Sequence, residues 1–348
     1  MNKKILYIDP ISSFGHKMFN EIWINDLLKL GCSVDLVSCA GYFDFIDKTN
    51  KNVRQVLDLE EKLFLKLKDN NPFLNRIRLF RILMKIKKSI DFSSYDFIIF
   101  SSYEEISFYF ARFSKKCYLV NHNNLSRINH FIKYFFVKRI SKKHKLIVLH
   151  DKFKRKLSEI GVESVFIPHG LPTKFQLKND KFNFYENAKL ILFSPSSLSS
   201  DEHFFRKLIS DIKFLNYLEE NKIILILKGN YDVISPSIVI LAKYLSQNEY
   251  RNVFLKSDVI LINYNESFKN RVSGVFYEAI SNEKIIMTSK YFYDEMDIDE
   301  EGIFIFSDFK SFENNLDAIL QKKNIMNNLC RDKEKYCTNI ITRIENEC

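Results

Sequence analysis

The sequence predicts an α/β protein with two domains, each built on a parallel sheet with helices on both faces. Its 348 residues are enough for two hydrophobic cores, and 46% of them are hydrophobic, which is typical of globular chains. Short apolar runs alternate with helical patterns along most of the chain, and this alternation favours βαβ units. Near residues 258–289, a strand, a polar loop and a helix follow one another, an order that can bind phosphate at the edge of a parallel sheet.

The first half of the chain predicts six strands and an amphipathic helix between the first two. The helix covers 19–30 and ends before Gly31. The strands are expected at 5–8, 34–37, 97–100, 118–120, 146–149 and 165–167. Ligands bind at the carboxyl ends of strands in such sheets, so the loop 9–17 is an active-site candidate. The chain has only eight glycines and lacks the G-x-G-x-x-G pattern of dinucleotide binders.

A rigid turn at Pro168, Gly170 and Pro172 marks the expected boundary between the two domains. After a polar connector, the second half predicts strands at 190–193, 223–227, 259–262 and 285–289. It predicts helices at 204–218, 237–246 and 273–281, and further helices in 314–348. We therefore assign 1–172 to an N-terminal domain, 173–322 to a C-terminal domain, and 323–348 to a final helix that packs back on the first domain.

The stretch 258–289 is the most informative part of the chain. It opens with a short apolar run that predicts a buried strand, and a polar loop leads from there to a helix. Ser273 is the expected N-cap, and Gly274 lets a ligand approach the backbone at the positive end of the helix dipole. Arg271, just before this terminus, would neutralise phosphates, and Glu278, one turn inside, would accept hydrogen bonds from a ribose diol.

These residues resemble the donor-nucleotide motif of GT-B glycosyltransferases, in particular the retaining glycosyltransferase family 4. The matching residues are Ser257, Asp258, Ser273, Gly274, Glu278, Ala279 and Lys284. That family often has a second glutamate eight residues before the matched Glu278, and this chain has Asn270 there. Taken alone, the same residues would also fit a buried βαβ edge whose glutamate merely favours the helix.

The resemblance implies the GT-B fold, in which two Rossmann-like α/β/α domains face each other across a cleft. It also implies sugar transfer from a nucleotide diphosphate sugar, with a UDP-sugar as the expected donor, to a glycan or lipid-linked glycan. Retention of anomeric configuration and a place in bacterial capsule, O-antigen or exopolysaccharide biosynthesis are part of this expectation. The alternative of a different class is a non-catalytic GT-B-like binding or scaffold subunit, which the departures from the family motif keep open.

The resemblance also assigns roles to individual residues at strand ends. His122, after the strand 118–120, would face the donor sugar, although as a loop histidine it could instead only hydrogen-bond its neighbours. The family often supplies an arginine and a lysine after the first strand of the second domain, where this chain has serines that include Ser197. Lys228 would then supply charge to the diphosphate, while a lysine at a strand end is also often just solvated. The expected catalytic set is His122, Arg271 and Lys228.

The first loop is the expected acceptor side, with Gly15 and His16 in its FGHKMF segment. A retaining enzyme of this type needs no dedicated base, because the leaving diphosphate helps to deprotonate the acceptor hydroxyl. An inverting enzyme would need one, and His16 or Glu104 would be examined first. His169 lies in the turn between the domains, so we expect it to line the cleft or the hinge.

No metal or other cofactor is expected. Asp297 and Asp299 form a D-x-D pattern, but it falls in the acidic stretch DEMDIDEEG, which predicts a solvated surface loop. Cysteines and histidines do not cluster as zinc ligands do, and the six scattered cysteines predict reduced packing residues.

Positive charge is concentrated in the first half of the chain. Residues 1–172 contain 30 Lys and Arg against 17 Asp and Glu, whereas the formal net charge of the whole chain is +10. The segments 76–88 and 131–145 interleave basic and apolar residues, a pattern typical of helices at an anionic membrane surface and also of core-facing helices with a solvated face. Nucleic acid is the other partner that such charge suggests, but no nucleic-acid-binding motif is present. With no apolar run long enough to span a membrane, we expect a cytoplasmic protein in peripheral contact with the inner face of the cell membrane.

Overall fold

The computed structural model describes residues 3–11, 16–44, 46–47, 49–60, 71–122, 124–126, 128–177, 187–196, 199–241, 245–326 and 331–346. The chain forms two compact units. Unit 1 comprises Met1–Pro172, Asn270–Val272 and Glu334–Cys348, and unit 2 comprises Thr173–Lys269 and Ser273–Lys333. Each unit is an α/β domain with a parallel sheet, so the predicted fold class is confirmed.

The sheet of unit 1 has seven parallel strands in the order β3-β2-β1-β4-β5-β6-β7. They are β1 (Lys4–Ile8), β2 (Ser33–Cys39), β3 (Val53–Leu59), β4 (Phe97–Phe100), β5 (Tyr118–Asn121), β6 (Lys145–Val148) and β7 (Ser164–Phe166). Because the order reverses at β1, the carboxyl ends of β1 and β4 flank the point where ligands bind in open α/β sheets. The strand β3, rich in polar residues, was not predicted.

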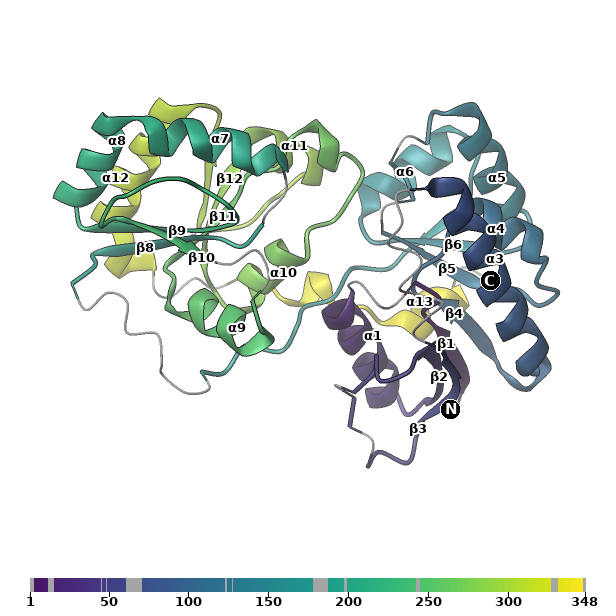
Figure 1. Ribbon diagram of the computed structural model, residues 1–348. Helices are drawn as coiled ribbons and strands as arrows, with labels where there is room; N and C mark the ends of the chain where they lie inside the picture. The colour runs from purple at the N-terminus through teal and green to yellow at the C-terminus, as the bar shows by residue number, and fades with distance from the viewer. Residues whose placement is uncertain are drawn as a thin grey trace. The chain divides into compact units, whose positions relative to one another are not determined.

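Helices cover both faces of this sheet. They are α1 (Lys17–Lys29), α3 (Pro72–Ser89), α4 (Glu105–Ala111), α5 (Phe131–Ser141), α6 (Asp151–Glu159) and α13 (Ile340–Asn346). In Figure 1, α1 and α13 lie on one side of the strands and α3, α4 and α5 on the other. The apolar faces of these helices pack on the β-branched and aromatic strand residues, which is the usual source of stability in this architecture.

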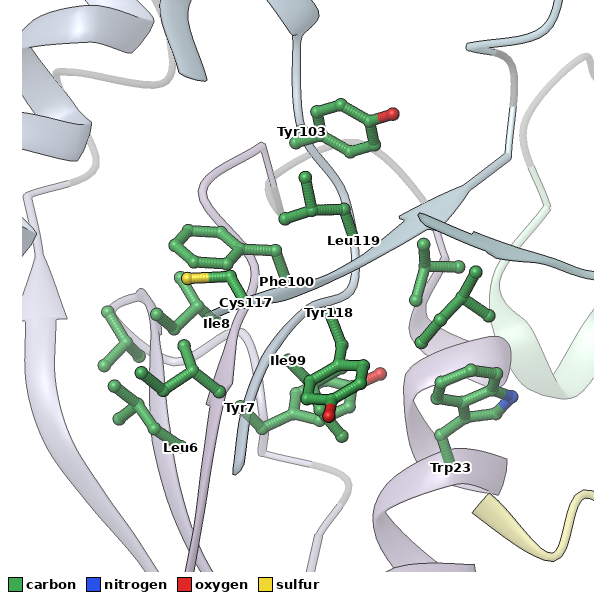
Figure 2. Packing of buried hydrophobic residues seen from close by; sticks show 14 of the residues in the cluster. Leu6, Tyr7, Ile8, Trp23, Ile99, Phe100, Tyr103, Cys117, Tyr118 and Leu119 are labelled. Carbon is green, nitrogen blue, oxygen red and sulfur yellow. The ribbon is translucent and has the colours of Figure 1, made fainter. Parts of the chain in front are cut away.

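The core of unit 1 is centred on the middle strands of its sheet, β1, β4 and β5. Figure 2 shows Tyr7 and Ile8 of β1 close to Ile99 and Phe100 of β4, with Trp23 on α1. All five side chains are completely buried. Residues on both faces of the inner strands are apolar, as expected where helices cover both sides of a parallel sheet.

The sheet of unit 2 has six parallel strands in the order β10-β9-β8-β11-β12-β13. They are β8 (Leu190–Ser194), β9 (Ile223–Lys228), β10 (Ile238–Leu241), β11 (Val259–Ile262), β12 (Ile285–Ser289) and β13 (Ile303–Phe306). β11 and β12 have the predicted bounds, and they pair in parallel from Val259 opposite Ile285 to Ile262 opposite Thr288. The carboxyl ends of these two strands therefore lie side by side.

The helices of unit 2 are α7 (Ser199–Ser210), α8 (Ile212–Glu220), α9 (Gln247–Lys256), α10 (Gly274–Ser281), α11 (Lys290–Met296) and α12 (Phe309–Met326). Figure 1 shows α7, α8 and α12 on one face of the sheet and α9 and α10 on the other. Short 3-10 turns occur at Phe92–Ser94, Glu266–Phe268 and Glu334–Tyr336. The core under α7, α8 and α12 contains Phe205, Phe214 and Phe312.

Two predicted helices of unit 2 were wrong in part. Residues 238–241 form the edge strand β10 and not a helix, because the run Ile-Val-Ile-Leu suits a pleated surface and pairs with β9. The helix expected at 204–218 is two helices, since Asp211 has extended backbone angles and its carboxylate accepts the Lys213 amide at 2.9 Å as the N-cap of α8. None of the helices in the described ranges is both long enough and apolar enough to cross a membrane.

Candidate functional site

The N-terminus of α10 is built as the sequence predicts. Ser273 is the N-cap, and its Oγ accepts the Phe276 amide at 3.3 Å and donates to the Tyr264 hydroxyl at 3.3 Å. A Cβ atom added to Gly274 would meet nothing within 4 Å. The first turn of α10 thus presents backbone N–H groups beside open space, which suits an anion.

Glu278 is buried on α10, with 8% of its surface exposed. The Tyr250 hydroxyl of α9 donates a hydrogen bond to its carboxylate. Burial raises the pKa of Glu278 to about 7, and the Tyr250 hydrogen bond and the charges of Arg251 and Lys228 oppose this rise. Because the pKa lies near neutral pH, Glu278 can exchange a proton under ordinary conditions.

Lys228 and Glu278 lie near each other in unit 2. Lys228 ends β9, and burial lowers the pKa of its ammonium while the charge of Glu278 opposes that effect. The Lys228 Nζ is 5.7 Å from the centroid of the Tyr250 ring, within range of a cation–π contact. The predicted Lys228 and Glu278 are therefore brought into one partly desolvated cluster with Tyr250.

Tyr250 and Arg251 on α9 are members of this cluster that the sequence did not suggest. The Arg251 guanidinium lies 5.3 Å from the Phe175 ring centroid, and its buried Nε has no hydrogen-bond partner among the described residues. The sequence does contain a signal for the start of α9, because Ser246 and Glu249 have the spacing of a capping box and form one in the structure. Recognising it would have placed a helix at 247–256, with both residues in its first two turns.

Arg271 lies in the short segment Asn270–Val272, which belongs to unit 1. Its Nε donates to the Ser126 Oγ at 3.1 Å. Asn270, with φ 59°, donates from Nδ2 to the Leu125 carbonyl at 3.2 Å and accepts from the Lys156 Nζ at 2.7 Å. The structure therefore places Arg271 among unit 1 residues, whereas Lys228 and Glu278 belong to unit 2.

His16, His122 and His169 form a cluster in unit 1. The His16 and His122 rings stack with centroids 4.0 Å apart, and the Phe19 ring meets the His122 and His169 rings edge-on at 4.5 and 5.1 Å. His122 Nε2 lies 2.9 Å from the Ser101 carbonyl, so this nitrogen carries the proton.

The imidazoles of His122 and His169 are buried and neutral at neutral pH, because burial takes the pKa of His122 well below its usual value and brings that of His169 to about 4. His16 is exposed, and the desolvation that it does experience lowers the pKa of its ring. The charge of Asp9 partly opposes the effect at His16. A neutral imidazole can accept a proton or a hydroxyl hydrogen bond, which is the property that an acceptor-side histidine needs.

Asp9, at the carboxyl end of β1, is a buried acid that the sequence did not single out. Its carboxylate accepts hydrogen bonds from Asn20 Nδ2 at 2.8 Å, Ser102 Oγ at 2.5 Å and the Ile11 amide at 3.1 Å. These bonds compensate the burial of the charge and fix the start of the loop that leads to His16.

Other predicted residues have structural roles or fall outside the description. Gly15 and Ser197 lie outside the described residues. Glu104 is the N-cap of α4, where it accepts the Ser107 amide at 2.8 Å and pairs with Arg76 at 3.0 Å. A carboxylate used in this way holds a helix and an ion pair together.

Two residues of the matched motif hold the backbone of unit 2. Asp258 accepts the Ile191 amide at 2.8 Å, which ties β11 to β8. The Lys284 Nζ donates to the Leu255 and Ser257 carbonyls at 2.6 and 2.7 Å, which ties the start of β12 to the end of α9. This part of the motif therefore fixes β11 and β12, the strands that precede and follow the helix α10 that carries Glu278.

Asp297 and Asp299 are both exposed, Asp297 as the left-handed C-cap of α11 with φ 46°. Within the described ranges, no three His, Cys, Asp or Glu side chains are grouped so that they could hold a metal ion.

Comparison with solved structures identifies the fold. HepE from Anabaena, in a crystal structure with UDP-glucose, matches with a TM-score of 0.58 at 13% identity over 93% of this chain and 91% of that chain. A UDP-forming α,α-trehalose-phosphate synthase from Burkholderia xenovorans matches with a TM-score of 0.62 at 9% identity, over 94% of this chain and 93% of that one. A UDP-N-acetylglucosamine 2-epimerase matches at 0.58 and 12% identity, over 94% and 90%.

These proteins define the class as GT-B, and this chain shares their fold. At such identities the likeness concerns the fold alone. No protein-family model matches the sequence, and a comparison with curated protein sequences finds no match. The activity must therefore be argued from the site residues.

Proposed function

We propose that this protein is a glycosyltransferase that transfers a sugar from a UDP-sugar to a glycan or lipid-linked glycan. The observation that carries the proposal is the cluster of Glu278, Tyr250 and Lys228 beside the capped N-terminus of α10. It combines a hydrogen-bond acceptor, a cation and free backbone N–H groups, which are the groups that a ribose diphosphate requires. HepE, crystallised with UDP-glucose, and the UDP-forming synthase have the same fold and add support.

Each residue has a proposed task. Glu278 accepts hydrogen bonds from the ribose hydroxyls, while Lys228 and the Gly274 end of α10 stabilise the diphosphate as charge develops on it. Arg271 and Ser197 complete the phosphate contacts. In unit 1, His122 contacts the donor sugar.

On the acceptor side, Gly15 and His16 receive the incoming hydroxyl. We assign the chain to the retaining type that glycosyltransferase family 4 represents, acting in bacterial surface-polysaccharide assembly. Retention is consistent with the structural use of Glu104, because that carboxylate is committed to the α4 cap and to Arg76.

Calorimetric titration with UDP-glucose and other nucleotide sugars tests the donor site. We expect Glu278→Ala and Arg271→Ala each to weaken donor binding about 10- to 100-fold, because a charge-assisted contact contributes about 1.5–3 kcal/mol. The matched control is Glu220→Ala, which removes an exposed carboxylate at the end of α8. Unchanged affinity in both site variants would contradict the donor assignment, and tight binding without transfer to any acceptor would indicate a non-catalytic subunit.

Transfer should not require a divalent cation, since helix N–H groups and basic side chains offset the phosphate charge in this proposal. We expect full activity after treatment with EDTA and removal of the chelator–metal complexes. Loss of transfer that manganese restores would show that this account is wrong and would direct attention to Asp297 and Asp299.

We also propose peripheral contact with an anionic membrane through the helices α3 and α5. The basic side chains of α3 and α5 would each contribute about 1 kcal/mol near anionic lipid, less at high salt. Co-sedimentation with vesicles should require anionic lipid and should fall as salt rises.

A further inference from the structure

The helices α3, α4 and α5 bound an open pocket of about 650 Å³ on unit 1. Six apolar side chains form most of its wall: Phe73, Ile77, Phe80, Ile106, Phe110 and Phe136. The helix α4 packs against both α3 and α5 (Figure 1), and the Ser107 hydroxyl donates to the Arg76 carbonyl at 3.0 Å, which ties α4 to α3. The pocket is therefore held open by packed helices, and its volume is in the range of small-molecule sites.

The surface around this pocket is unusually apolar. Six of the ten large apolar side chains that are exposed among the described residues lie on these three helices: Phe73, Leu74, Phe110, Phe131, Ile132 and Phe135. Phe131 is 77% exposed and Phe73 is 67% exposed. Concentrated exposure of this kind marks a contact surface, because single exposed apolar residues are ordinary but patches are not.

The same surface is strongly basic. The helix α3 contains six basic residues and no acidic one, and α5 contains three and none. Arg112 lines the pocket at the end of α4, and its guanidinium has no hydrogen bond or ion pair with the part of the chain that is described. Arg76, the other cation in the wall, pairs with Glu104, and the Arg139 guanidinium lies 5.3 Å from the Phe135 ring centroid.

We propose that this pocket binds the acyl chain of an anionic membrane phospholipid, with Arg112 next to the headgroup. The proposal rests on the membrane contact described above and adds a defined lipid site within it. The apolar wall of the pocket suits the acyl chain of such a lipid, and the Arg112 guanidinium at the edge of the pocket suits its anionic headgroup. A second copy of this chain fits less well, because it would bring the same excess of positive charge to the interface.

Photolabelling tests the site directly. Phosphatidylglycerol with a diazirine in the middle of its acyl chain is included in phosphatidylcholine vesicles, and the labelled residues are located by mass spectrometry. We expect labels on the wall residues Ile77, Ile106 and Phe136 as well as on the exposed Phe131. Phe110→Asp should abolish labelling inside the pocket and weaken vesicle binding at least about tenfold, because it places a charge where the chain enters.

Matched variants distinguish substitutions that act on the pocket from substitutions that change charge or apolar surface elsewhere on the protein. Ile212→Asp makes the same kind of change at a side chain that is 66% exposed on unit 2, and it should leave labelling intact. Arg112→Ala should weaken binding to anionic vesicles about fivefold. Lys51→Ala, which removes an exposed cation that lies on none of these helices, should have little effect.

UDP-glucose binding is measured in every variant, so that failure of the donor site and failure of the lipid site are distinguished. Unchanged Trp23 fluorescence in Phe110→Asp shows that unit 1 of the variant is folded. Labels restricted to Phe131, Ile132 and Phe135 would overturn the proposal, as would unchanged labelling in Phe110→Asp. Absence of labelling together with self-association that Phe110→Asp abolishes would identify a second copy as the occupant and would likewise overturn it.

Discussion

At Glu278, in the proposed donor-binding cluster, burial changes the pKa of a carboxyl group. Removal from water disfavours its charged form, and the Tyr250 hydroxyl, Arg251 and Lys228 restore part of that form's stability. The pKa of about 7 that results is far above the usual value for glutamate, 4.5. A carboxyl group whose pKa lies near 7 changes its protonation when its surroundings change slightly, for example when a diphosphate binds nearby.

The raised pKa predicts that stability falls as pH rises. Between about pH 4.5 and pH 7, the folded protein keeps a proton that the unfolded chain has released, so the stabilisation is complete below this window and is lost through it. The shift corresponds to at most about 3 kcal/mol. Urea unfolding followed by circular dichroism should show this loss in the natural protein and a flatter profile in Glu278→Gln.

Donor binding should have the opposite pH dependence. Ribose hydroxyls donate to a carboxylate more strongly than to a carboxylic acid, so UDP-glucose affinity should rise from about pH 6 to about pH 8. Glu278→Gln should bind more weakly and without this slope. An equal slope in the glutamine variant would assign the titration to another group.

Arg271 shows why a role assigned from a motif needs the surroundings of the residue. Its position just before α10 predicts a phosphate contact, and its Nε also donates to the Ser126 Oγ within unit 1. Neighbouring Val272 packs against the hydrophobic core of unit 1. The variant Arg271→Ala therefore tests two contributions, phosphate binding and the attachment of the segment Asn270–Val272, and thermal unfolding measured beside the titration separates them.

The turn that follows β7 depends on a glycine. Gly170 has φ +85°, and a Cβ there would lie 2.5 Å from a methyl of Ile22 on α1 and 2.9 Å from a methyl of Thr338. The Trp23 indole also donates to the His169 carbonyl at 3.2 Å. This turn is thus packed tightly between α1 and the segment that leads to α13, and no side chain fits at its centre.

Gly170→Ala should destabilise unit 1 by about 2–4 kcal/mol, since it combines left-handed strain with overpacking. Gly31→Ala is the control, because Gly31 has φ +77° but open space around it, so only the strain of about 1–2 kcal/mol applies. Trp23, the only tryptophan, is buried in unit 1 and reports unfolding by its fluorescence. Equal effects of the two substitutions would show that packing at Gly170 contributes nothing.

The C-terminal residues of the chain are part of unit 1, the unit that the first 172 residues form. Residues 334–348 belong to unit 1, where Ile340 and Ile344 of α13 are completely buried in its core. The C-terminal helix therefore completes a core whose other members come from the first half of the chain. Long-range packing of this kind ties the folding of unit 1 to the last residues of the sequence.

Ile344→Ala should lower the stability of unit 1 by about 2–5 kcal/mol, the usual cost of a large-to-small change in a core. The midpoint of urea unfolding read by Trp23 fluorescence measures this loss. Ile319→Ala is the matched control, because Ile319 is equally buried in the core of unit 2. If both variants shift the Trp23 transition equally, the two units unfold as one and α13 has no special role.

The sequence by itself determined the fold class and the frame of the proposed donor site. Strand–helix alternation predicted two parallel sheets, and the bounds of β11 and β12, the Ser273 cap and the position of Glu278 on α10 follow from local patterns. These features depend on neighbours in the chain, through β-branched runs, capping chemistry and helix periodicity. Such signals can be read without knowledge of distant residues.

Tertiary structure decided what surrounds those features. Tyr250 reaches Glu278 from another helix, Arg271 is bound by Ser126, and β10 forms where an apolar run meets the open edge of a sheet. The pocket bounded by α3, α4 and α5 likewise depends on how these three successive helices pack against one another. Desolvation and long-range packing are properties of the folded chain, and no local pattern encodes them, which is why the pKa of Glu278 and the apolar pocket emerged only from the structure.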